Sequence, residues 1–152
     1  PKTPKPHKIN DKIYFRKLLL TAVKSDYIEN TMFSSDGWSK ERAEKSMVLI
    51  GILYNNKIID EKIMSHILND FKKKIEYKED SPQEYFEIVE KSIHLLSCLA
   101  ATIILTDETV KIFGDLDDFL EKQMDIYEDK KCISKKIRLV CKHTIEELRK
   151  KK

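Results

Sequence analysis

Glycine and proline are scarce in this sequence. Its 152 residues include 3 glycines and 4 prolines. That is too few for the frequent turns of a β-sandwich or barrel, and too few for a glycine-rich loop that holds a nucleotide phosphate. No apolar run approaches the roughly 18 residues of a membrane-spanning helix, and the first residues lack the apolar stretch of a signal peptide. We therefore expect a soluble, largely helical, cytoplasmic domain.

Cysteine and an excess of one charge are also scarce. Cys98, Cys132 and Cys141 are odd in number and form no C-x-x-C pair, which argues against a disulfide scaffold or a thiolate zinc site. Lys and Arg total 29 against 26 Asp and Glu, so the formal net charge is +3. A dedicated nucleic-acid binder is expected to be more basic. The hydrophobic content of 41% exceeds that of a disordered chain.

Capping residues and apolar periodicity predict six amphipathic helices after a loop or linker over residues 1–11. Ser39 precedes the second helix, Asp60 the third and Ser134 the sixth. Residues 81–84, SPQE, have the form of a capping box with Pro82 in the first helical position. The first two helices are expected over residues 12–29 and 40–54, and the others begin near residues 60, 82, 116 and 135.

The apolar positions of each helix define the face expected to pack inward. In the first helix this face comprises Phe15, Leu18, Leu19, Ala22 and Val23, which follow the i, i+3, i+4, i+7, i+8 spacing. In the fourth helix it comprises Phe86, Val89, Ile93, Leu96 and Ala100. Each helix pair has one strongly apolar face, and stacking one pair on the next buries that face.

The fold class is therefore predicted to be all-α, with antiparallel helix pairs stacked as a HEAT-like α-solenoid over residues 12–152. The pairs begin near residues 12, 60 and 116, a spacing close to the roughly 40–47 residues of HEAT or armadillo repeats. A compact six-helix bundle is the alternative arrangement that the pattern leaves open.

Catalytic and metal-binding motifs are not evident, so the chain is not expected to be an enzyme or to hold a cofactor. His7, His66, His94 and His143 stand far apart and match no local catalytic signature. His143 and Glu146 can meet on one helix face, as a surface contact. The run DLDD at residues 115–118 lacks the later glycine and glutamate of a calcium loop and is better explained by helix capping.

Charge is distributed unevenly between the last two helices. The fifth is acidic, and the sixth is basic through Lys135, Lys136, Arg138, Lys142 and Arg149. An acidic surface beside a basic one suits a charged protein partner, and the basic half alone suits a phosphate backbone. No aromatic residue interleaves the basic cluster, so base stacking is not expected.

Four segments resemble a known family in order and spacing. Residues 14–27, YFRKLLLTAVKSDY, resemble a helix of the middle domain of eukaryotic translation initiation factor 4 gamma. In that family it is the opening helix of the third repeat. The helix pair that follows resembles ERAEKSMVLIGILYNNKIIDEKIM at residues 41–64. Later helices are similar to EKSIHLLSCLA at residues 90–100 and to LDDFLEKQMDIYEDKKCISKKIRLVCKHTIEELR at residues 116–149. Lys45, Ser46 and Ile52 depart from the family pattern, and the charged insertion after the first helix is short.

The resemblance implies a scaffold rather than an enzyme. The family's middle domain is a five-repeat HEAT crescent that holds the DEAD-box helicase initiation factor 4A and, in some members, RNA and initiation factor 3. This chain would correspond to its C-terminal three repeats, acting as a monomer. The matching contact for the helicase is Leu139, in place of a family phenylalanine, with Lys136, Arg138 and Lys142 around it.

Other partners remain open on the sequence alone. Related middle domains act in splicing, in nonsense-mediated decay and in poly(A)-binding-protein interaction, with the same fold and a different partner. A basic RNA-binding helical module is a further alternative, with Lys135, Lys136, Lys142 and Arg149 as the residues that would contact phosphate.

Overall fold

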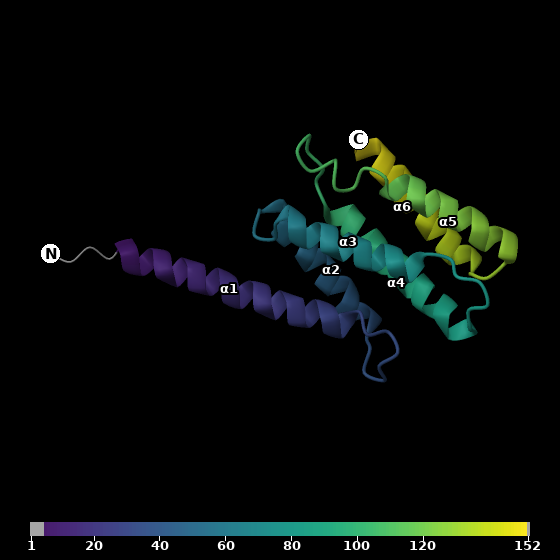
Figure 1. Cartoon of the computed structure of the whole chain (residues 1–152), viewed down its shortest axis with the longest axis horizontal. Coiled ribbons are helices and arrows are strands. Elements are labelled where there is room, and N and C mark those ends of the chain that lie inside the picture. The colour runs from purple at the N-terminus through teal and green to yellow at the C-terminus, as the bar shows by residue number, and fades with distance from the viewer. Residues whose placement is uncertain (1–4, 152) are drawn as a thin grey trace.

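The computed structural model describes residues 5–151, with side chains from residue 11 onward. Within this range the chain is entirely helical and contains no strand (Figure 1), so the predicted all-α class is confirmed there. The helices are α1 (Lys5–Asn30), α2 (Lys40–Asn55), α3 (Glu61–Ile75), α4 (Gln83–Thr102), α5 (Leu116–Lys130) and α6 (Lys135–Lys151).

Side-chain caps begin the second, third and sixth helices as the sequence predicts. Ser39 accepts a hydrogen bond from the backbone N–H of Arg42, and Asp60 accepts one from Ile63. Ser134 Oγ accepts from the N–H of Ile137 at 3.3 Å. Each bond satisfies one of the N–H groups that a helix leaves unpaired in its first turn.

The predicted capping box of the fourth helix and the predicted start of the first helix are wrong. The capping box at residues 81–84 does not form, because Pro82 is the N-cap residue of α4 and makes no side-chain cap, while Ser81 Oγ donates to the carbonyl of Lys78. The first helix begins at Lys5 rather than near residue 12, with Pro6 in its first turn, where a missing N–H needs no partner. Of the predicted loop, residues 5–11 are helical and residues 1–4 lie outside the described residues.

The helices pack as consecutive pairs. Each of α1, α3 and α5 packs on the helix that follows it, and α2, α4 and α6 pack on one another in that order. Gly51 makes the contact between α2 and α4 especially close, because a Cβ atom at this position would lie 2.7 Å from Thr102 Cγ2. Tyr127 on α5 ties the last pair to the second by donating a hydrogen bond of 2.6 Å to the carbonyl of Ile75.

The apolar core follows the predicted face of the fourth helix, where Leu96 is 1% exposed. On α2 the core side chains include Ala43, Met47 and Ile50. The largest fully buried side chains come from α2, α3, α4, α5 and two loops, and none comes from α1 or α6: Met47, Ile50, Ile59, Met64, Phe71, Ile75, Ile93, Leu95, Leu96, Leu99, Phe113 and Tyr127.

The predicted inward face of α1 is wrong for three of its five residues. Phe15 is 66% exposed and Leu18 52% exposed, and Ala22 is exposed, whereas Val23 is buried. The reason is length. With 26 residues, α1 is longer than the 16-residue α2 on which it packs, and its N-terminal part runs beyond the other helices (Figure 1).

None of the described helices combines the length and the apolar character needed to cross a membrane.

Candidate functional site

The hairpin of α5 and α6 positions the residues that the sequence predicts to bind a partner. The left-handed conformation of Lys131 ends α5, and the N–H of Cys132 then donates to the carbonyl of Tyr127. Ser134 begins α6 and donates its own N–H to Glu90 Oε1 on α4 at 2.8 Å. The start of α6 is thus fixed both to α5 and to α4, which places Leu139 in the second turn of a well-anchored helix.

A groove of about 480 Å³ lies between α5 and α6. Met124 and Ile145 are among its lining residues and are nearly buried, at 9% and 7% exposure. Leu139 also lines the groove but is 59% exposed. The remaining lining residues are all charged: Glu121, Asp125, Glu128, Lys135, Arg138, Lys142, Glu146 and Arg149. An exposed aliphatic side chain ringed by charges of both signs is suited to bind a protein surface rather than a small molecule.

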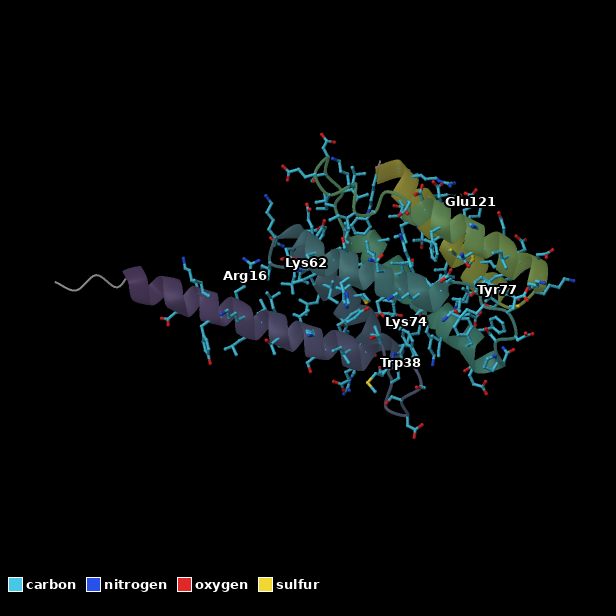
Figure 2. All side chains as sticks on the ribbon, in the orientation of Figure 1. Arg16, Trp38, Lys62, Lys74, Tyr77 and Glu121 are labelled. Atoms are coloured by element: carbon cyan, nitrogen blue, oxygen red, sulfur yellow. The ribbon has the colours of Figure 1, made fainter. Side chains whose placement is uncertain are left out.

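Ion pairs between the two helices hold the basic side of this groove in place. Arg138 donates to Glu128 on α5 at 3.2 Å. Arg149 contacts Glu121 at 2.6 Å, Asp117 at 3.2 Å and Asp118 at 3.3 Å. Glu121 lies on α5 (Figure 2). The hydrogen bonds to these carboxylates, that to Glu121 foremost, raise the pKa of Arg149.

The predicted site residues are brought together with one exception. Lys135, Arg138, Leu139, Lys142 and Arg149 all line the groove between α5 and α6. Lys136, the exception, is exposed on α6 but does not line the groove.

The basic residues of α6 differ in whether their charges are already paired with carboxylates of this chain. Arg149 is compensated by three carboxylates of α5, and Arg138 by one. Lys135, Lys136 and Lys142 make no hydrogen bond or ion pair with any described residue. A polyanion would therefore meet three free ammonium groups here rather than the full basic cluster.

The acidic run at residues 115–118 has a role in addition to the one predicted. Asp115 is the N-cap residue of α5, but its side chain makes no cap and instead pairs with Lys72 at 3.0 Å. Asp117, whose side chain is 4% exposed, and Asp118 pair with Arg149. Asp115 holds the N-cap position and Asp117 and Asp118 lie in the first turn, as the capping interpretation predicts, but their side chains also pair with basic residues that tertiary packing brings near.

The histidines are dispersed in the structure, as they are in the sequence. His94 lies 2.6 Å from Glu44, which joins α4 to α2, while His66 lies on α3. The side chain of His7 lies outside the described residues. Among residues with described side chains, no cluster of three or more His, Cys, Asp or Glu is arranged to hold a metal ion.

The sequence alone does not assign the acidic residues that line the groove to a functional site. Glu121, Asp125 and Glu128 are recognisable there only as the acidic face of a helix, and Met124 only as a core residue. The i, i+3, i+4 and i+7 spacing of 121, 124, 125 and 128 places them on one side of α5, which is the available signal for a shared surface.

Comparison with known proteins identifies no relative of this chain. No protein-family model, no curated protein and no solved structure matches this chain.

Proposed function

We propose that this chain is a HEAT-like α-solenoid fragment of a translation initiation factor 4 gamma relative, and that it acts as a non-catalytic scaffold for the DEAD-box helicase initiation factor 4A. The observation that carries the proposal is the exposure of Leu139, 59%, in a groove lined by Lys135, Arg138 and Lys142. This is the position at which the sequence resemblance places the helicase contact.

The packing order supports the solenoid part of the proposal. In a solenoid each helix pair contacts its neighbours along the chain, and the second helices of the pairs form a continuous row. The packing of α2 on α4 and of α4 on α6 follows that order. Exposed apolar side chains on both helices of the first pair, Phe15 and Leu18 on α1 with Leu49 and Ile52 on α2, are the kind of surface that a preceding pair would cover.

The character of the groove supports a protein partner. Leu139 can lose much of its exposed apolar area on binding, at roughly 25 cal/mol per Å². The surrounding charges lie at the rim, where they contribute chiefly to orientation and association rate. Because leucine is less often a dominant contact than an aromatic residue, the affinity at this single site is expected to be modest.

The mechanism that follows from this proposal is a shift in helicase conformation. A scaffold stimulates an enzyme without chemistry of its own if it binds one conformation of that enzyme more tightly than another. The α5–α6 groove would provide one contact with one lobe of the helicase. Its effect on the conformational equilibrium is limited to the difference in its affinity for the two states.

Calorimetric titration of the chain with purified initiation factor 4A, and with the N-terminal lobe of the helicase alone, tests this function. We expect saturable binding to both, and Leu139→Ala to weaken it by about tenfold. Leu49→Ala is the matched control, since Leu49 is an exposed leucine on α2, outside the groove. Equal weakening by both variants, or no binding by the wild-type chain, contradicts the proposal.

RNA binding is separable in the same experiment. An RNA contact through Lys135, Lys136 and Lys142 would weaken steeply with salt and would be insensitive to Leu139→Ala. If RNA is the partner, titration with a single-stranded RNA in place of the helicase should show this salt-sensitive binding. If the groove binds protein only, the RNA should not bind.

A further inference from the structure

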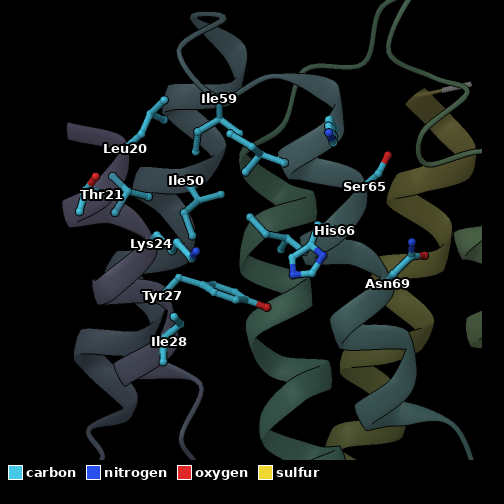
Figure 3. A pocket seen from close by; sticks show the side chains of 14 residues that line it. Leu20, Thr21, Lys24, Tyr27, Ile28, Ile50, Ile59, Ser65, His66 and Asn69 are labelled. Carbon is cyan, nitrogen blue, oxygen red and sulfur yellow. The ribbon is translucent and has the colours of Figure 1, made fainter. Parts of the chain in front are cut away.

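A second groove, at the opposite end of the molecule, lies between α1 and α3. It has a volume of about 690 Å³. In Figure 3, Leu20, Lys24, Tyr27 and Ile28 border it from α1, and His66 from α3. This groove shares no residue with the groove between α5 and α6.

Contacts between α1 and the second helix pair keep the groove open. Arg16 donates a hydrogen bond of 3.1 Å to the carbonyl of Ile58, just before α3 (Figure 2). Tyr27 donates one of 2.6 Å to Asp70 on α3, and its ring meets that of Phe71 edge-on at 6.2 Å. The groove therefore lies beside two tethers that are 11 residues apart on α1, about 16 Å of helix.

The floor of this groove is apolar. Val23 from α1, Ile50 from α2, Ile67 from α3 and Ile59 from the preceding loop line it and are nearly or fully buried. Ile28, also among the lining residues, is 49% exposed. Aliphatic side chains from three helices and one loop therefore meet in a single groove, which can receive the apolar anchors of an amphipathic helix at i, i+3 or i+4, and i+7.

The ionisable residues that line the groove, apart from Tyr27, are all basic. Lys24 lies on α1, Lys62 and His66 lie on α3, and no carboxylate is among the lining residues. Neither lysine makes a hydrogen bond or ion pair with any described residue, although many other lysines of this chain do. In Figure 3 the side chains of Lys24 and His66 extend into the space between the two helices.

We propose that the groove between α1 and α3 binds an acidic amphipathic helix of a partner protein. The apolar face of such a helix would bury against Leu20, Ile28 and Ile63, the apolar lining residues that are partly exposed. Its flanking carboxylates would face Lys24 on one wall and Lys62 on the other. Charge complementarity selects this occupant, because a basic or neutral amphipathic helix would bury its apolar face equally well but leave both ammonium groups unpaired.

The proposal is independent of helicase binding, since the helicase site is assigned to the other groove. One scaffold could then hold two proteins at once, and each interaction can be removed without altering the other.

The test uses the full chain and a fluorescein-labelled helical peptide of about 15 residues, with leucine at i, i+4 and i+7 and glutamate at the flanking positions. Fluorescence anisotropy should show saturable binding. The double variant Lys24→Glu/Lys62→Glu should weaken it by about tenfold or more. The matched control is Lys73→Glu/Lys122→Glu, two exposed lysines outside the groove with the same change in net charge, which should change affinity by less than about twofold.

Two further measurements distinguish other occupants. The same peptide with lysine in place of glutamate should not bind, and Ile28→Asp should abolish binding of the acidic peptide while the circular dichroism spectrum stays unchanged. Equal binding of the acidic peptide to both double variants, or no saturable binding, overturns the proposal. A dimer of the chain that Ile28→Asp dissociates in sedimentation also overturns it, because the occupant would then be a second copy.

Discussion

Tyr27 on α1 donates a hydrogen bond of 2.6 Å to the carboxylate of Asp70 on α3, 43 residues away in the chain. Asp70 also accepts a bond of 2.6 Å from Lys74 on its own helix. Val23, Tyr27 and Asn30 are the buried side chains described on α1, so this bond is a main tether between the first helix and the second pair. It also bounds the apolar groove between α1 and α3.

Tyr27→Phe should therefore destabilise the chain while leaving its helical content unchanged. The ring contact with Phe71 is retained, and only the hydrogen bond to a charged acceptor is lost, which corresponds to about 1–2 kcal/mol of the free energy of unfolding. Urea denaturation measures this loss. Tyr14→Phe is the control, because Tyr14 is 65% exposed and makes no hydrogen bond with a described residue. A loss no larger than that of the control would show that the bond does not tether α1.

The Asp70 carboxylate should make the free energy of unfolding depend on pH. Burial raises the pKa of Asp70, but hydrogen bonds from Lys74 and Tyr27 outweigh burial and leave the pKa below its ordinary value of 3.8. A carboxyl whose pKa is lower in the folded state stabilises the fold above its unfolded pKa, and this contribution disappears as the pH falls through the folded pKa.

Asp70→Asn should accordingly lose less stability than the wild type when the pH is lowered from neutral to about 3. Urea midpoints at the two pH values measure the difference. Asp36→Asn, at an exposed loop position, should retain the wild-type pH dependence. The assignment fails if Asp70→Asn and the wild type lose stability in parallel over that interval.

Gly51 should not tolerate a methyl group. Alanine is favoured over glycine in a helix by about 1 kcal/mol, but its Cβ would lie 2.7 Å and 2.8 Å from the side-chain atoms of Thr102. Overpacking of this kind costs about 1–3 kcal/mol, so we expect a net loss of stability on Gly51→Ala. Gly37→Ala, where the nearest atom is Ser35 Oγ at 4.0 Å, should be close to neutral. Thermal melting compares the two, and a stabilised Gly51→Ala variant would mean that α2 and α4 separate readily.

Leu96→Ala should be the most destabilising of these changes. Leu96 is 1% exposed at the centre of α4, the helix that packs against α2, α3 and α6. Removing its side chain costs about 2–5 kcal/mol, depending on how far the neighbours relax into the cavity. Leu139→Ala, at 59% exposure, should change stability by less than about 0.5 kcal/mol. Chemical denaturation of both variants checks the placement of the two leucines.

The sequence predicts the central helices well because their signals are local. Ser39, Asp60 and Ser134 cap helices within a few residues of themselves, and the period of 3.6 identifies the buried face of α4. The cluster of Lys135, Arg138, Leu139 and Lys142 is predictable for the same reason, since these residues share one helix at spacings of three and four.

The features that the sequence does not predict depend on tertiary contacts. The apolar stripe of α1 reads as an inward face, but Val23, Tyr27 and Asn30 are the side chains that α1 buries, and Phe15 and Leu18 are exposed. The carboxylates near the start of α5 read as a cap, but packing brings Arg149 and Lys72 to them. Lys24 and Lys62 come to line one groove from two helices, 38 positions apart, and no local pattern relates them.

Hydrogen exchange of the chain with and without initiation factor 4A reports helicase binding and its location in one experiment. If the α5–α6 groove binds the helicase, amide exchange should slow in the first turns of α6, around Leu139, with no change in the exposed turns of α1. Protection confined to α1, or no protection anywhere at saturating helicase, would contradict the proposed binding.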